Sequence, residues 1–237
     1  GEHYVVNGSK TFISNGQHAG LIILAAKTNP NARAKGVSLL LVDTTLDGFK
    51  KGTNLEKIGM HCQDTSELFF DNLKVPKDQL LGNEGSGFAY LMQELPRERL
   101  GIAVTALGSI LGSLDITLDY VKERQAFGQS LGQMQNTRFT LAQAKIDALA
   151  TESFVRQCIE LYMQEKLDVP TAAAVKAYST DVQCKVADNL LQMFGGYGYM
   201  SEYPISRFFI DARVQRIYGG TNEIMKEVVA RGLIGKA

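Results

Sequence analysis

The sequence has no excess of charge of either sign. Its 237 residues include 25 Lys and Arg against 25 Asp and Glu, so the formal net charge at pH 7 is zero. Proteins that bind nucleic acids or anionic membranes through a basic field carry an excess of positive charge. The balance gives no indication of a nucleic-acid partner and favours a neutral or buried ligand site.

Cysteine is also scarce, and its spacing is uninformative for metals. The three cysteines, Cys62, Cys158 and Cys184, show no paired spacing of the kind that holds a metal ion. They lie in apolar or helical contexts, which predicts buried, reduced thiols in an intracellular protein and no metal site.

Long apolar runs, internal repeats and low-complexity tracts are missing as well. No stretch approaches the roughly 20 apolar residues of a membrane span, so we expect none. The hydrophobic fraction of 45% and the charged fraction of 21% are typical of a globular protein with a sizeable core.

The first 80 residues show the short runs of a β domain. Runs of β type at 21–26, 37–42 and 67–75 are separated by Gly, Asn, Asp and Pro. Residues 3–13 carry an Asn-Gly pair, which predicts a hairpin. We therefore assign 1–80 to part of an antiparallel β domain.

Residues 81–237 are expected to form helices. A helix at 85–95 is expected to end at Pro96, and the next, at 97–124, has no charge between Arg99 and Asp115. A helix with so few polar residues should be buried nearly all round.

Four further helical segments follow. One should run to about residue 167 with Asn136 or Thr137 as its cap, and the next should begin at Asp168 and end at Gly195-Gly196. Segments at 205–214 and 222–232 complete the set. The predicted class is α+β, a partial antiparallel β domain followed by an all-α up-down four-helix bundle.

Two glutamates, Glu94 and Glu98, stand four residues apart around Pro96. Desolvation at the mouth of an apolar helix favours the neutral carboxyl, which can turn it into a general base. Alternatively, a helix starting at Pro96 places Glu98 in the first turn, where an acid stabilises the helix dipole. Arg99 is either an ion-pair partner of Glu98 or a substrate contact.

Residues 217–224, IYGGTNEI, read as a helix start preceded by two glycines. Thr221 can cap the last helix, and Gly219 and Gly220 let backbone N–H groups approach an anion or a carbonyl oxygen. A purely structural helix start explains the same residues, just as ordinary helix ends explain 124–128 and 192–199.

Together, these segments resemble the acyl-CoA dehydrogenase family. The matching stretches are FISNG at 12–16, PRERL at 96–100, RQAFG at 124–128 with Gln135, QMFGG at 192–196, and IYGGTNEI at 217–224. The resemblance extends over essentially the whole chain and looks closest to the long-chain enzymes. It implies an FAD enzyme that oxidises a fatty acyl-CoA to the trans-2-enoyl-CoA. It also implies that this chain is the C-terminal portion of a longer enzyme.

The position of the base separates two groups within the family. Most members carry the catalytic glutamate at the loop position that is Gly219 here. A smaller group, including the long-chain and isovaleryl enzymes, has a small loop residue and a helix glutamate in a context that matches Glu98. The resemblance thus implies Glu98 as base, with Glu94 as first competitor, and the Gly219 N–H as a donor to the thioester oxygen.

The resemblance also assigns cofactor and substrate contacts by position. FAD of the same subunit is expected to contact Phe12, Ile13, Ser14, Thr221, Asn222 and Glu223. A neighbouring subunit's FAD is expected to meet Arg124, Phe127, Gln135, Gln192, Gly195 and Gly196. Acyl-CoA is expected to contact Lys35, Pro96, Arg97, Arg99, Tyr218, Gly219 and Gly220. Lys35 has the alternative of being an ordinary solvated lysine. Many relatives have tryptophan at Phe12, so stacking is kept and an N–H donor is lost.

Assembly and setting follow from the same resemblance. It implies a homotetramer built as a dimer of dimers, electron-transferring flavoprotein as the electron acceptor, and a location in the bacterial cytoplasm or mitochondrial matrix. Ala89, Gly101, Ala103 and Ala106 either open a slot for a long acyl tail or simply allow tight helix packing. The alternatives are a branched-chain (isovaleryl-type) dehydrogenase, an acyl-CoA oxidase, a noncatalytic fragment for CoA binding or oligomerisation, and a plain helical scaffold.

Overall fold

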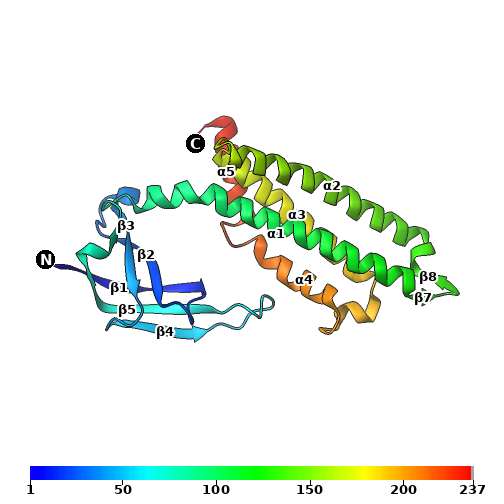
Figure 1. Ribbon diagram of the computed structural model, residues 1–237, viewed down its shortest axis with the longest axis horizontal. Helices are drawn as coiled ribbons and strands as arrows, with labels where there is room; N and C mark the ends of the chain where they lie inside the picture. Colours follow the sequence, from blue (N-terminus) through cyan, green and yellow to red (C-terminus); the bar gives the residue numbers. More distant parts are fainter. Residues whose placement is uncertain (236–237) are drawn as a thin grey trace. The chain divides into compact units, whose positions relative to one another are not determined.

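The strands of the N-terminal part pair into two antiparallel sheets. The computed structural model describes residues 1–235 (Figure 1). One sheet has the order β1-β5-β4, with β1 at His3–Ser14, β5 at Thr65–Pro76 and β4 at Phe49–Asn54. The other has the order β2-β3-β6, with β2 at Leu21–Lys27, β3 at Val37–Asp43 and β6 at Leu80–Leu81. Short 3₁₀ turns, η1 at Arg33–Gly36 and η2 at Lys77–Gln79, lie between strands.

Alternating apolar residues of these strands form one core. Leu24, Leu40, Val42, Leu68 and Val75 are among its buried members. The apolar runs at 21–26, 37–42 and 67–75 are thus strands as predicted, while β4 was not anticipated because its residues, FKKGTN, are mostly polar.

The hairpin expected at residues 3–13 is wrong. These residues form one strand, β1, which pairs with β5 from His3–Pro76 to Ser14–Thr65. The Asn-Gly pair instead lies at a shift of register between Val6 and Gly8. Because a single partner strand runs beside both halves, the pair makes a bulge and the chain does not reverse.

The C-terminal part is a bundle of long helices. Its elements are α1 (Gly87–Glu123), the small hairpin β7 (Gln125–Ala126) and β8 (Gln129–Ser130), η3 (Leu131–Gln133), α2 (Gln135–Met163), α3 (Val169–Gln192), η4 (Gly195–Tyr199), α4 (Pro204–Gln215) and α5 (Asn222–Ile234). Helix α3 contacts α2, α4 and α5. Figure 1 shows α1, α2 and α3 running side by side. The predicted class, an antiparallel β part followed by a helical bundle, is confirmed.

The chain divides into two compact units, Gly1–Glu94 and a second that begins at Leu95. The division falls inside α1, near Pro96, which lies in the interior of that helix. The expectation that Pro96 separates two helices is therefore wrong, and Glu98 does not occupy a first turn. Proline removes one backbone hydrogen bond, which a helix of 37 residues held by packing along its length can lose.

Helix α1 is not buried all round. Its buried residues form one stripe that includes Ala103, Ala106, Ile110 and Leu114, while Val104 is 43% exposed. The stripe recurs every three or four residues because helices pack on only one side of α1. By length and composition α1 is apolar enough to span a membrane, contrary to expectation. Core helices pass the same test, and this stripe belongs to the helical core.

Two predicted caps are confirmed. The Asp168 carboxylate accepts a hydrogen bond from the Thr171 N–H at 2.6 Å, and the Thr221 hydroxyl accepts one from Ile224 N–H at 3.4 Å. The cap expected at Asn136 or Thr137 is wrong, because α2 starts at Gln135 after Met134. Helix α2 also ends earlier than expected, at Met163.

The cysteines are all free thiols. Cys158 is buried and Cys184 is partly buried, whereas Cys62 is exposed, so the expectation of burial fails for Cys62.

Candidate active site

The loop between α4 and α5 lies against α1. Gly219 and Gly220 have φ values of 63° and 92°, a backbone conformation that glycine adopts without strain. A Cβ built on Gly219 would lie 2.4 Å from the Cδ1 atom of Ile102 in α1. A side chain at position 219 would therefore have to push this methyl group aside and adopt a strained, left-handed backbone.

Glu98 shares the face of α1 that meets this loop. Ile102 follows Glu98 by four residues, and residues with that spacing are neighbours on one helix face. Helical side chains also lean toward the N-terminus, so Ile102 leans toward the turn that carries Glu98. Glu94 precedes Ile102 by eight residues and is rotated by about 80° from it. Glu98 is exposed in this chain, as is Glu94.

Arg99, beside Glu98, is buried without a full set of partners. Its side chain is 6% exposed, and its Nε and Nη1 atoms have no hydrogen-bond acceptor among residues 1–235. Burial lowers the pKa of Arg99, and the charge of Glu98 opposes that effect. In the described chain no ion pair joins these two side chains, so the geometry favours a ligand contact for Arg99.

A buried lysine holds the loop from the other side. The Lys176 ammonium, on α3, donates hydrogen bonds to the Gly220 carbonyl at 2.8 Å and to Asn222 Oδ1 at 2.9 Å. The residue has no exposed surface. Burial lowers its pKa to about 8, although Asp181 and other charges modulate the value. Lys176 was not among the residues predicted from the sequence. Its signal was a lone lysine in the apolar run TAAAVKAYST.

Asn222 turns its side chain into the bundle. Its Nδ2 donates to the Ala177 carbonyl at 3.2 Å and to Asp181 Oδ1 at 3.0 Å. Asp181 also pairs with Arg216 at 2.6 Å, on the other side of the loop. Both ends of the loop at 216–221, called the glycine loop from here on, are therefore tied to α3.

The remaining predicted residues of this region lie at its surface. Tyr218 is 37% exposed, and desolvation raises its pKa. Glu223 is exposed at the start of α5, and hydrogen bonding to its own backbone N–H, with a contribution from Thr221, lowers its pKa. The Gly219 N–H has no acceptor in the described part of the chain. That N–H is available to an external oxygen. Pro96 is half-buried and Arg97 is exposed.

The small residues of α1 differ in their surroundings. Ala103 and Ala106 are fully buried, which indicates tight helix packing. A Cβ on Gly101 would meet nothing within 4 Å, and Ala89 is exposed. Of this set, Gly101 leaves open space beside α1.

A second cluster lies at the far end of α1. A hollow of about 450 Å³ is lined by Tyr120, Arg124, Leu131, Met193, Phe194, Gly195, Gly196, Tyr197 and Met200. The Arg124 guanidinium lies 5.6 Å from the centre of the Tyr197 ring. A Cβ on Gly195 or Gly196 would meet nothing within 4 Å, so both glycines border open space. Since 25 residues separate Arg99 from Arg124, the two clusters lie about 37 Å apart along the helix.

The other predicted residues of the second cluster do not line this hollow. Phe127 is 95% exposed at the tip of the β7–β8 hairpin, where it and Gly128 have φ values of 54° and 80°. Two such residues make a type I′ turn, which matches the twist of a hairpin. Gln192 lines an adjacent hollow of about 370 Å³, and Gln135 is exposed and lines neither.

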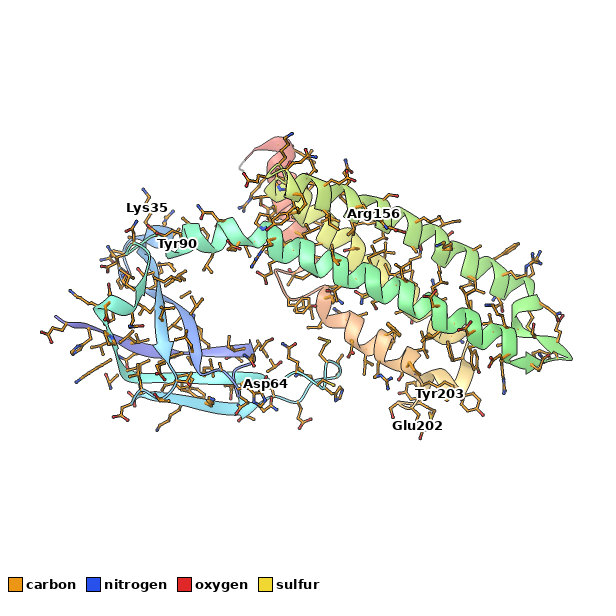
Figure 2. The ribbon with its side chains drawn as sticks, in the orientation of Figure 1. Lys35, Asp64, Tyr90, Arg156, Glu202 and Tyr203 are labelled. Atoms are coloured by element: carbon orange, nitrogen blue, oxygen red, sulfur yellow. The ribbon has the colours of Figure 1, made fainter. Side chains whose placement is uncertain are left out.

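The predicted site residues of the first unit lie on β1 and η1. Phe12 is 77% exposed with a φ of 61°, at the shift of register between Lys10 and Ile13. This irregularity turns an aromatic ring out of the sheet. Ile13 is partly buried and Ser14 is exposed. Lys35, on η1, points outward into solvent (Figure 2).

Comparison with known proteins places these features in one family. Residues 85–234 match the acyl-CoA dehydrogenase C-terminal domain, and residues 1–73 match the acyl-CoA dehydrogenase middle domain. The chain belongs to the acyl-CoA dehydrogenase family. The resemblance predicted from sequence is thereby confirmed.

Individual relatives support the assignment across the whole chain. The mouse mitochondrial long-chain specific acyl-CoA dehydrogenase is 46% identical over 99% of this chain and 55% of its own length. The crystal structure of an acyl-CoA dehydrogenase from Geobacillus kaustophilus superposes with a TM-score of 0.97 at 45% identity, covering 99% of this chain and 62% of that one. Butyryl-CoA dehydrogenase from Megasphaera elsdenii gives 0.94 at 36% identity, covering 98% and 61%. The chain thus spans a little over half the length of these relatives.

Proposed function

We propose that the protein is an FAD-dependent acyl-CoA dehydrogenase that forms the trans-2-enoyl-CoA from a long-chain fatty acyl-CoA, with Glu98 as the base. The observation that carries the proposal is the contact of Gly219 with Ile102. A glutamate at position 219 would have to displace the Ile102 methyl group and adopt a strained, left-handed backbone, which disfavours a base on the loop, while Glu98 lies on the same face of α1.

The chemistry assigns one task to each of these groups. The Glu98 carboxylate accepts the proton from the α-carbon. The Gly219 N–H donates to the thioester oxygen, which takes up negative charge as that proton leaves, and a preorganised donor of this kind lowers the barrier. FAD, when bound, supplies the acceptor for the hydride from the β-carbon. The electron pair of the α C–H bond then forms the new carbon–carbon double bond.

The residues of this chain fit an FAD molecule. Arg124 supplies positive charge suited to a pyrophosphate, at a hollow where Gly195 and Gly196 add no side chain. Phe12 presents an exposed aromatic ring suited to packing on a flavin. We assign Arg124, Gly195 and Gly196 to the FAD of a neighbouring subunit. Phe12, Ile13, Ser14 and 221–223 are assigned to the FAD of the same subunit.

Acyl-CoA is assigned to the glycine loop and to α1. Tyr218, Gly219 and Gly220 surround the thioester, and Arg99 offers buried, unpaired N–H groups to the pantetheine chain. Pro96, Arg97 and Lys35 complete the proposed contacts. The open space beside Gly101 and the likeness to the mouse long-chain protein support a long acyl tail.

We further propose a homotetramer in which subunits share FAD sites. The exposed Phe127 and the hollow beside Arg124 support this, because no residue among 1–235 covers either of them. Electron-transferring flavoprotein is the proposed acceptor, in the mitochondrial matrix or the bacterial cytoplasm.

Anaerobic bleaching of the flavin tests the proposal. In the complete FAD-loaded protein, a long-chain acyl-CoA should bleach the flavin rapidly. Glu98→Gln should retain FAD and slow bleaching by about 10²–10⁴-fold, because a general base typically contributes a factor of that size. Glu94→Gln is the matched control and should bleach within a few-fold of wild type.

Two outcomes would contradict this assignment. Persistent bleaching in Glu98→Gln with loss in Glu94→Gln would make Glu94 the base. Rapid, stoichiometric peroxide formation in air would instead identify an acyl-CoA oxidase.

A further inference from the structure

Lys176 is a fully buried charged residue that the proposed reaction does not use directly. It lies on α3 among Ala172, Ala173, Val175 and Ser179, all buried. Burying an ammonium group in such surroundings is unfavourable unless the group is hydrogen-bonded. The structure provides two acceptors, and both belong to the segment that follows Gly219.

The two acceptors lie on either side of Thr221, the cap of α5. One is the Gly220 carbonyl, at 2.8 Å from Nζ, and the other is Asn222 Oδ1, at 2.9 Å. Asn222 is itself oriented by donating to Ala177 and Asp181. A single cation on α3 therefore joins the last peptide of the glycine loop to the first residue of α5.

Glycine makes this restraint necessary. Gly219 and Gly220 both have positive φ, and glycine loses more conformational freedom on ordering than any other residue. Gly219 and Gly220 have no side chains that could fix their own conformation. Among the described residues, their peptide planes are held by the packing of Gly219 on Ile102, by the packing of Gly220 on Met225 and by the hydrogen bonds at the ends of the loop.

We propose that Lys176 is a positioning residue that aims the Gly219 N–H at the thioester oxygen by holding the Gly220 carbonyl and Asn222. This inference rests on the proposed function. Lys176 has no exposed surface and touches neither substrate nor cofactor in this scheme, so it acts only through the loop.

The charges around Lys176 are balanced. Asp181 and Glu223 favour its cationic form, while burial, Arg99 and Arg216 oppose it. The opposite charges offset one another, and burial, the largest effect, sets the direction of the pKa shift.

The test distinguishes an effect on the orientation of the Gly219 N–H from an effect on the binding of FAD or of the substrate. In the complete FAD-loaded protein, Lys176→Met keeps the aliphatic stem and removes the donors. A 3-thiaacyl-CoA serves as probe, because its α-proton can be removed while the sulfur at the β-position gives up no hydride. The fraction deprotonated is read from the long-wavelength absorbance of the anion beside the flavin. Lys185→Met, which removes an exposed lysine on the same helix, is the matched control.

The expected result is specific to the proton step. Lys176→Met should keep FAD content and probe affinity within about threefold of wild type, raise the pKa for α-deprotonation of the probe by at least one, and slow bleaching at least 30-fold. Lys185→Met should match wild type. Unchanged deprotonation in Lys176→Met overturns the proposal, and so does a loss of FAD or of probe affinity in proportion to activity.

A second Lys176 variant and a parallel measurement of Glu98→Gln complete the experiment. If Lys176→Met does not fold, Lys176→Gln replaces it. The glutamine side-chain nitrogen lies one bond closer to the backbone than Nζ and falls short of both acceptors. If Lys176→Gln deprotonates the probe as fully as wild type does, the proposal is also overturned. Glu98→Gln is measured in parallel. Failure of wild type to bleach, or bleaching by Glu98→Gln, refutes the proposed function, whereas a normal Lys176→Met beside an inactive Glu98→Gln refutes only the positioning role.

Discussion

Alanine at position 219 should destabilise the protein through its backbone conformation and through one atom of Ile102. The φ of 63° imposes the left-handed backbone, which costs a residue with a Cβ about 1–2 kcal/mol. The Cβ would also lie 2.4 Å from Ile102 Cδ1, the movable end of that side chain, so the steric cost should be at the low end of overpacking, about 1 kcal/mol. We expect Gly219→Ala to lower the free energy of unfolding by about 2–3 kcal/mol in total.

Ile102→Val removes that atom and leaves Cγ1, which is 3.9 Å from the built Cβ. Alone it should cost about 0.5–1.5 kcal/mol. Combined with Gly219→Ala, it should remove the steric cost of the new Cβ, giving a coupling energy of about 1 kcal/mol in favour of the double variant. The measurement is urea unfolding of the four proteins, followed by circular dichroism at a fixed FAD concentration.

Gly128→Ala provides the matched control for this cycle. Gly128 has a φ of 80°, and a Cβ there meets nothing within 4 Å, so only the backbone cost of about 1–2 kcal/mol should remain. Ile102→Val should not change that cost. If Gly219→Ala and Ile102→Val add within about 0.5 kcal/mol, the contact between the loop and α1 is not the one described.

Three other changes have defined outcomes. Asp168→Ala removes the cap of α3 and should lower the free energy of unfolding by about 1 kcal/mol, measured by urea titration against the conservative Asp168→Asn. Lys176 has a pKa of about 8 when folded and 10.5 when unfolded, so the unfolded state binds more protons between these values and stability should rise with pH there. The gain is about 3 kcal/mol, and it should disappear from the same titration in Lys176→Met. Phe127→Ser should change stability by less than about 0.5 kcal/mol because the ring is 95% exposed, yet weaken FAD retention on gel filtration; unchanged retention would remove Phe127 from the proposed cofactor site.

Local chemistry made some features predictable. Asp168 and Thr221 were identified as caps because a cap needs only a side-chain oxygen and the next three residues. The strands at 21–27, 37–43 and 65–76 were found because buried, apolar side chains dominate them. Such signals are contained within a few consecutive residues.

The features that were missed depend on partners distant in sequence. The Asn-Gly pair of β1 reads as a turn until β5 is known to run beside it. Pro96 reads as a helix end until packing along the rest of α1 is known. Lys176 gains its role from Gly220, 44 residues away, and Ile102 from Gly219, so neither could be assigned from its own neighbourhood.

The contact of Ile102 with the glycine loop also constrains the history of this protein. A side chain at position 219 would meet the Cδ1 methyl of Ile102 and would adopt the left-handed backbone that glycine accepts. A smaller residue at 102 would therefore make a side chain at 219 easier to accept. Substitutions at the two positions should depend on each other, so related chains should seldom change position 219 without a change at 102.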